Sequence, residues 1–117
     1  MISFVRGDTF AFKTKLKTQD KIAIRKEDID TLFVTSRKSA STESPIIFQK
    51  TLQDVEIDSD GYCHVKFNPI NTENLKYATY FFDIEITLKS GYRKTRLFQF
   101  KLTKETTIHG SGDESGS

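Results

Sequence analysis

Apolar and polar residues alternate along much of this chain with a period of two, which is the period of a β-strand. The alternation is clearest in residues 79–88. One face of that run is apolar and the other carries two acids; the first face holds Tyr80, Phe82, Ile84, Ile86 and Leu88, and the second holds Phe81, Asp83, Glu85 and Thr87. Because a slip of one residue would place both acids in the core, the pattern predicts a strand with a fixed register.

Other runs share this period. The expected inward residues are Phe10, Phe12, Thr14 and Leu16 in residues 9–17, Cys63, Val65 and Phe67 in residues 62–67, and Phe98, Phe100 and Leu102 in residues 92–103. Residues 46–52 and a short pair, Val55 and Ile57, also indicate strands by their β-branched and aromatic content. In residues 31–37 both faces carry large apolar side chains, so the inward face stays open. Leu97 breaks the alternation, which predicts a β-bulge.

Turn signals separate the predicted strands. An Asp-Gly pair precedes Tyr62, Ser90-Gly91 precedes Tyr92, and the Ser/Thr-rich residues 38–44 indicate a loop. A short helical turn is expected near residues 71–76, with Asn71 or Thr72 as its cap. Short strands at this spacing, without a helix long enough for a crossover connection, predict an all-β antiparallel sandwich of about seven or eight strands. A closed barrel is the alternative.

Composition agrees with one small domain. The chain has 117 residues, of which 36% are hydrophobic, and its formal net charge is +2. We expect a single domain over residues 1–109 and a flexible Gly/Ser-rich acidic tail over residues 110–117. The charge is too mild and too spread to indicate a nucleic-acid partner. No run of apolar residues is long enough for a membrane span, and the start of the chain lacks the pattern of a signal peptide.

Residues with catalytic or metal-binding chemistry are few. His64 is expected on the outward face of a strand and His109 at the start of the tail, and neither has a partner at ligand spacing. Cys63 is the one cysteine, so no internal disulfide forms, and an inward cysteine behaves as a small apolar residue. We therefore expect no enzyme, no catalytic residue, no metal and no cofactor.

Three short motifs have both a functional and a structural interpretation. Asp58-Ser59-Asp60-Gly61 resembles the opening of a calcium loop, but Pro69 stands at the twelfth position, where such loops need Glu, so a hairpin turn is favoured. Arg6-Gly7-Asp8 matches an integrin-binding tripeptide, although a turn is favoured at these residue types. A basic cluster, consisting of Lys89, Arg93, Lys94 and Arg96, indicates either a solvated hairpin or a contact with an acidic surface.

One anomaly in the pattern favours binding. Phe33, Phe81 and Leu97 are large apolar side chains at positions expected to face outward. Exposed apolar residues in a cluster mark an interface, so these three residues are the predicted docking site. The alternative is that a loop covers them locally.

The order of motifs along residues 2–107 resembles a known family. The motifs are Arg6-Gly7-Asp8-Thr9, Phe10-x-Phe12, the strand in residues 32–37, Ile47-x-x-Lys50, Ile57, the turn at Gly61, Val65-x-Phe67, Thr72-x-x-Leu75, Tyr80-x-Phe82-Asp83-Ile84, Phe100-x-Leu102 and Thr106. In this order the chain resembles the immunoglobulin-like N-terminal domain of phage baseplate upper proteins and related small prophage structural proteins of Gram-positive hosts. It departs from them in Ala78, where members often have Gly, in the lack of a Gly near Phe98, and in its shorter length.

The resemblance implies an immunoglobulin-like sandwich and a non-enzymatic virion structural protein. Such a protein would be a tail or baseplate module, made in the host cytoplasm, that docks onto other virion proteins and self-associates in a symmetric assembly. The alternative is a surface recognition module that binds carbohydrate or a protein receptor. For that role Tyr62, Tyr77 and Tyr92, which lie near predicted turns, are the candidate contacts.

Overall fold

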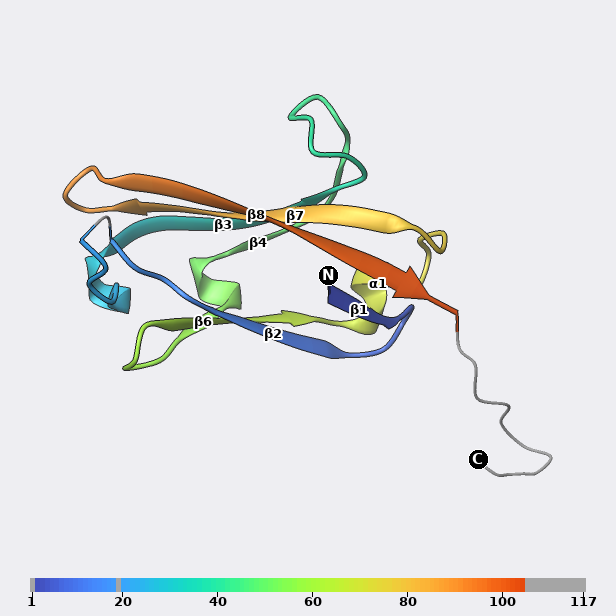
Figure 1. Ribbon diagram of the computed structural model, residues 1–117, viewed down its shortest axis with the longest axis horizontal. Helices are drawn as coiled ribbons and strands as arrows, with labels where there is room; N and C mark the ends of the chain where they lie inside the picture. The colour runs from blue at the N-terminus through green and yellow to red at the C-terminus, as the bar shows by residue number, and fades with distance from the viewer. Residues whose placement is uncertain (1, 19, 105–117) are drawn as a thin grey trace.

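Two β-sheets pack face to face in the computed structural model, which describes residues 2–18 and 20–104 (Figure 1). One sheet has five strands in the order β1-β8-β7-β3-β4, and the other has three in the order β2-β6-β5. The strands are β1 (Ile2–Val5), β2 (Phe10–Lys15), β3 (Ile29–Arg37), β4 (Ile46–Thr51), β5 (Glu56–Ile57), β6 (Tyr62–Phe67), β7 (Thr79–Leu88) and β8 (Arg93–Thr103). The predicted all-β sandwich is confirmed, and the two sheets do not close into a barrel. The named ladders are antiparallel as predicted, except that β1 pairs with β8 in parallel.

Strand β7 lies at the centre of the larger sheet, between β3 and β8. Its even-numbered residues are buried, as the alternation predicts. The inward face of β3, which the pattern left open, is the one that carries Leu32 and Val34. Val34 pairs with Ile84 of β7, so the even-numbered residues of β7 and those of β3 from Leu32 to Ser36 face the core, and Phe33 faces outward.

The predicted β-bulge at Leu97 is wrong. The β7–β8 ladder runs without a shift from Thr79↔Lys101 to Thr87↔Arg93, so there is no bulge at Leu97. The irregularities lie in β3 instead, between Ile29 and Thr31 and between Ser36 and Arg37. Leu97 breaks the apolar pattern because it faces outward on β8.

The predicted helical turn is present, but it begins earlier. Helix α1 spans Pro69–Thr72, and two 3₁₀ turns, η1 (Lys26–Asp28) and η2 (Leu52–Asp54), lie elsewhere. The N-cap is Asn68, not Asn71 or Thr72, and its backbone N–H donates to the Asn71 side chain at 2.8 Å. Pro69 suits the first helical position because it lacks the N–H that a helix start leaves unbonded. No helix in the described ranges is long and apolar enough to cross a membrane.

Phenylalanine rings fill the core between the sheets. Phe67 of β6 is fully buried, and its ring packs within 5.2–6.1 Å, centroid to centroid, of five others. Those rings belong to Phe4, Phe10, Phe48, Phe82 and Phe100. Burial of one such side chain contributes about 1.5–3 kcal/mol, and well-oriented pairs add to it. One residue of the smaller sheet therefore joins four of the five strands of the larger sheet.

The hairpin turn before β6 depends on Gly61. Its φ of +86° lies in the left-handed region, which favours glycine. Its carbonyl oxygen accepts a hydrogen bond from the Leu16 N–H at 2.8 Å, which brings the turn close to the chain after β2. A Cβ added at Gly61 would lie 2.9 Å from the Cβ of Ala23. The position therefore demands glycine for its backbone angle and for space.

We predict that Gly61→Ala destabilises the fold more than Gly91→Ala. Gly91 also has a positive φ, +97°, but a Cβ there would meet nothing within 4 Å. The left-handed backbone alone costs a non-glycine residue about 1–2 kcal/mol, so Gly91→Ala should lose that much. Gly61→Ala should lose more, because Ala23 must also move. Urea unfolding of both variants measures the difference, and equal losses would contradict the steric argument.

Candidate interaction surface

The three predicted interface residues all lie on the outer face of the five-stranded sheet. Phe81 and Leu97 are neighbours across the β7–β8 ladder, because Phe81 pairs with Gln99 and Asp83 pairs with Leu97. Phe33 lies two strands away from Leu97, opposite Glu85. Leu97 is 55% exposed, and both phenylalanines are half-buried. The structure thus brings Phe81 and Leu97 together and places Phe33 apart from them.

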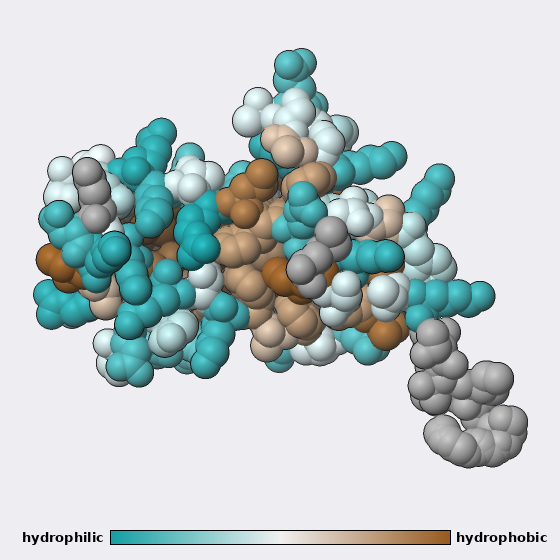
Figure 2. Space-filling model, in the orientation of Figure 1, coloured by the Kyte–Doolittle hydropathy of each residue, from teal (hydrophilic) through white to brown (hydrophobic). Residues whose placement is uncertain are grey.

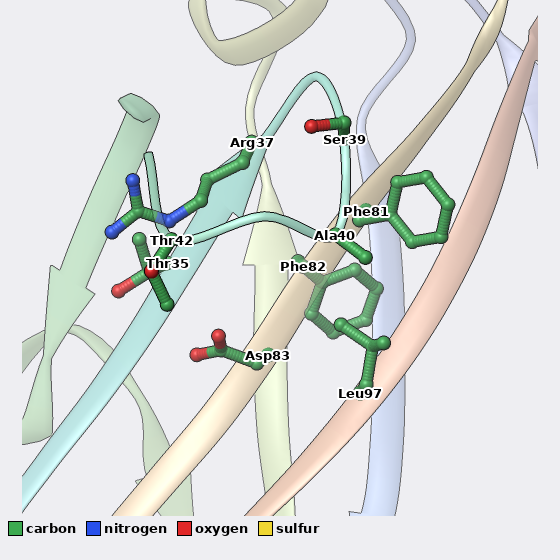
Figure 3. A pocket seen from close by; sticks show the side chains of 9 residues that line it. All are labelled: Thr35, Arg37, Ser39, Ala40, Thr42, Phe81, Phe82, Asp83 and Leu97. Carbon is green, nitrogen blue, oxygen red and sulfur yellow. The ribbon is translucent and has the colours of Figure 1, made fainter. Parts of the chain in front are cut away.

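Phe81 and Leu97 form one side of a shallow hollow, which we call the outer hollow (Figure 3). Its lining residues are Thr35, Arg37, Ser39, Ala40, Thr42, Phe81, Phe82, Asp83 and Leu97. The β3–β4 loop, residues 38–45, supplies one wall through Ser39, Ala40 and Thr42. The sequence shows this segment only as a polar loop, so its contribution to the surface was missed. The hollow combines an apolar side with a polar side that contains Arg37 and Asp83.

Two carboxylates face outward at the hollow without forming a salt bridge to a described cation. Asp83 and Glu85 are successive outward residues of β7, and within residues 2–18 and 20–104 neither forms a salt bridge. Burial raises the pKa of Asp83, the charge of Glu85 raises it further, and Arg37 lowers it. The charged form of Asp83 is therefore held on this face at a cost in stability.

Residues of the Arg6-Gly7-Asp8 motif join the β1–β2 turn to the end of α1 by hydrogen bonds, and we call this pair of contacts the Arg6-Gly7 lock. The Arg6 Nη1 donates to the Leu75 carbonyl oxygen at 3.0 Å, and its guanidinium lies 4.2 Å from the centre of the Tyr77 ring. The Gly7 N–H donates to the Oγ1 of Thr72, a fully buried residue, at 3.0 Å. The arginine is thus engaged within the fold, which agrees with the interpretation of the motif as a turn.

The Asp58 motif is likewise engaged in a hairpin turn. Asp58 Oδ1 accepts the N–H groups of Asp60 and Tyr62 at 2.9 and 3.0 Å, and Oδ2 lies 2.9 Å from His64 Nε2. The hydrogen bond from His64 is the main cause of the lowered pKa of Asp58, and the backbone bonds add to it. Both oxygens are thus used within the turn. In the described part of the chain no three metal-ligating side chains come together.

Cys63 and the tyrosines show no shared site. Cys63 is fully buried, and burial raises the pKa of its thiol to about 12, so the thiol stays protonated at neutral pH. The ring of Tyr62 lies under the Lys13 and Lys15 ammonium groups, Arg6 covers Tyr77, and Tyr92 packs against the core. His109 and the predicted tail lie outside the described residues.

No protein-family model matches this chain, and a search of curated proteins finds no match.

We predict that Thr72→Val weakens the Arg6-Gly7 lock. Valine keeps the buried shape of threonine but leaves the Gly7 N–H without its acceptor, which costs about 1–3 kcal/mol. Thr72→Ser is the control, since it keeps the hydroxyl. Hydrogen exchange at the Gly7 amide separates loss of the bond from loss of packing. The amide should exchange at least about tenfold faster in Thr72→Val and stay protected in Thr72→Ser. Equal protection in both variants would show that the bond is not formed.

We predict that Asp83→Asn stabilises the protein at neutral pH. The pKa of Asp83 is raised on folding, so the cost of its charge is present above the folded pKa and vanishes below the ordinary value of 3.8. The advantage of Asp83→Asn in urea unfolding should therefore disappear as the pH falls through that interval. NMR titration of Asp83 supplies the control: Glu85→Gln should lower its pKa and Arg37→Gln should raise it. An unchanged Asp83 pKa in both variants would contradict the assigned causes.

Proposed function

We propose that this chain is a non-enzymatic structural module of a phage virion, part of a tail or baseplate, that docks onto other virion proteins. The observation that carries the proposal is the outer hollow, where the exposed Leu97 and the half-buried Phe81 present apolar surface beside Asp83, which forms no salt bridge. Aromatic and apolar side chains that fill a partner's pocket supply most of the energy of a protein interface.

The resemblance to phage baseplate domains gains physical support from the Arg6-Gly7 lock. Two motifs that carry the resemblance, Arg6-Gly7-Asp8-Thr9 and Thr72-x-x-Leu75, lie far apart in the chain and touch in the fold. Contacts between distant motifs give a physical reason for both motifs to occur together in one sequence. This contact is consistent with the resemblance, on which the proposed role rests.

Docking through a small surface suits a symmetric assembly. A shallow hollow of this kind provides a weak contact, and many weak contacts become a stable structure when symmetry repeats them. The proposed mechanism is therefore binding alone: one sheet face lies against a neighbouring virion protein, and the rigid phenylalanine core holds that face in shape.

The proposal predicts that the chain is incorporated into virions. Particles purified from an induced lysogen that carries the gene should contain it at a fixed ratio to the tail proteins. Phe81→Ser combined with Leu97→Ser should lower its incorporation by about tenfold or more, because truncation of an interface anchor costs about 2 kcal/mol. Thr79→Ser, at the exposed first position of β7, is the matched control. Finding the chain free in lysates and absent from purified particles would contradict the proposal.

A further inference from the structure

Strand β8 has an edge that β1 covers only in part. β1 pairs with β8 from Ile2↔Phe100 to Val5↔Thr103, whereas β8 begins at Arg93. Within the described ranges no strand pairs with residues 93–99 on that side. Burial changes at the same point: Phe100 and Leu102 are buried, but most of residues 93–99 are exposed. The first half of β8 is therefore an open sheet edge.

The direction of each backbone group in β8 follows from three hydrogen bonds. At the two ends of the β7–β8 ladder, the Leu88 N–H donates to the Tyr92 carbonyl oxygen at 2.8 Å and the Leu102 N–H to the Ala78 carbonyl oxygen at 3.0 Å. Even-numbered residues of β8 thus bond toward β7. On the other side, the Arg6 N–H donates to the Thr103 carbonyl oxygen at 3.1 Å. The N–H and C=O groups of Arg93, Thr95 and Leu97 therefore point toward the open edge.

The open edge is strongly basic. Residues 93–99 of β8 contain Arg93, Lys94 and Arg96, and neither β8 nor the nearby β2 contains an acid. The nearest acids, Asp83 and Glu85, lie on the other side of β8, on β7. The Lys94 Nζ reaches the Lys17 carbonyl oxygen at 3.4 Å, and the Arg96 Nη1 reaches the Thr14 Oγ1 at 3.0 Å. These two side chains thus lie at the gap between the sheets. None of the cations of β8 forms a salt bridge with a described acid.

A small niche opens beside this edge, and its lining is partly apolar. Leu16, Ile84 and Ile86 form its apolar part, and Lys17, Lys94 and Arg96 complete it. Figure 2 shows mainly hydrophilic side chains over the end of the molecule that carries the β7–β8 turn, with a larger apolar area nearer the middle. The surroundings of the edge thus offer positive charge together with apolar contact.

A second copy of this chain is a poor occupant for the edge. Pairing of two β8 edges would bring Arg93, Lys94 and Arg96 of one copy against the same residues of the other, with no acid on either strand to compensate. Like charges on adjacent strands are destabilising. The edge instead complements an extended segment that carries carboxylates.

We propose that the open edge of β8 binds an extended acidic segment of a partner protein by strand addition. The added strand bonds with the backbone of Arg93, Thr95 and Leu97. Its side chains alternate: carboxylates lie against Lys94 and Arg96, and apolar side chains lie on the outer face beside Leu97. The inference rests on the proposed docking function and names the chemistry of the partner.

A fluorescent nine-residue peptide of alternating Val and Glu, capped at both ends, serves as the probe. It should bind the full chain in fluorescence anisotropy, and the version with Lys in place of Glu should bind at least tenfold more weakly. Thr95→Pro removes an outward N–H while leaving the β7 ladder intact, so it should reduce binding at least tenfold. Thr95→Val keeps the N–H and is the matched control.

A charge exchange keeps the test decisive if Thr95→Pro does not fold. The double variant Lys94→Glu with Arg96→Glu should prefer the Lys peptide over the Glu peptide. Failure of the Glu peptide to bind at 1 mM, unchanged binding in Thr95→Pro, or equal competition by a thymidine nonanucleotide would each overturn strand addition; the last outcome would indicate general polyanion binding instead. Virion incorporation without peptide binding would overturn strand addition and leave the proposed function standing. Peptide binding without virion incorporation would overturn the proposed function and leave strand addition standing.

Discussion

The packing of Phe67 against five other phenylalanine rings is the interaction on which the rest of the structure depends. It joins the smaller sheet to the larger one, and it includes Phe4 of β1. Phe4 of β1 stacks on Phe10 at 4.4 Å and on Phe100 at 5.7 Å, centroid to centroid. These contacts hold β1 at the aromatic end of the sandwich. The first half of β8 therefore has no neighbouring strand among the described residues.

The parts of the fold that the sequence predicts are those in which one face is plainly apolar. β7 is the clearest case, because Asp83 and Glu85 exclude the alternative register. β3 could not be oriented, since Phe33 is as apolar as Leu32 and Val34, and only pairing with β7 decides which residues face the core. The predicted N-cap of α1 was wrong for a related reason. Asn68, Asn71 and Thr72 are all good cap residues, and the sequence does not show at which of them the helix begins.

The candidate surface was predictable only in part. Phe81 and Leu97 stand out in the sequence as apolar residues at outward positions, and the ladder makes them neighbours. Their separation from Phe33 and the wall provided by the β3–β4 loop depend on strand order, which a pattern of period two does not contain. The open edge is harder still to foresee. It arises because β1 is much shorter than β8, and strand length is a weak signal in a short apolar segment such as Ile2–Val5.

Leu97 links the two surfaces that the structure offers to a partner. Its side chain borders the outer hollow, and its backbone lies on the open edge of β8. A partner strand added at that edge would continue the sheet past Leu97 and place its own side chains beside the hollow. Asp83 and Glu85 of β7 lie on the outer face beside Leu97, whereas Lys94 and Arg96 of β8 reach toward the smaller sheet, so the two surfaces differ in charge. Such an arrangement favours one orientation of a bound partner over others.

Hydrogen exchange at four consecutive amides of β8 tests the central claim, that β1 leaves this edge open. Lys94 and Arg96 bond toward β7, whereas Thr95 and Leu97 point away from it. In the free protein, NMR should show slow exchange at Lys94 and Arg96 and exchange at Thr95 and Leu97 that is faster by about tenfold or more. Equally slow exchange at all four amides would mean that another part of the chain or a second copy already covers this edge of β8, and it would contradict the claim that the edge is open.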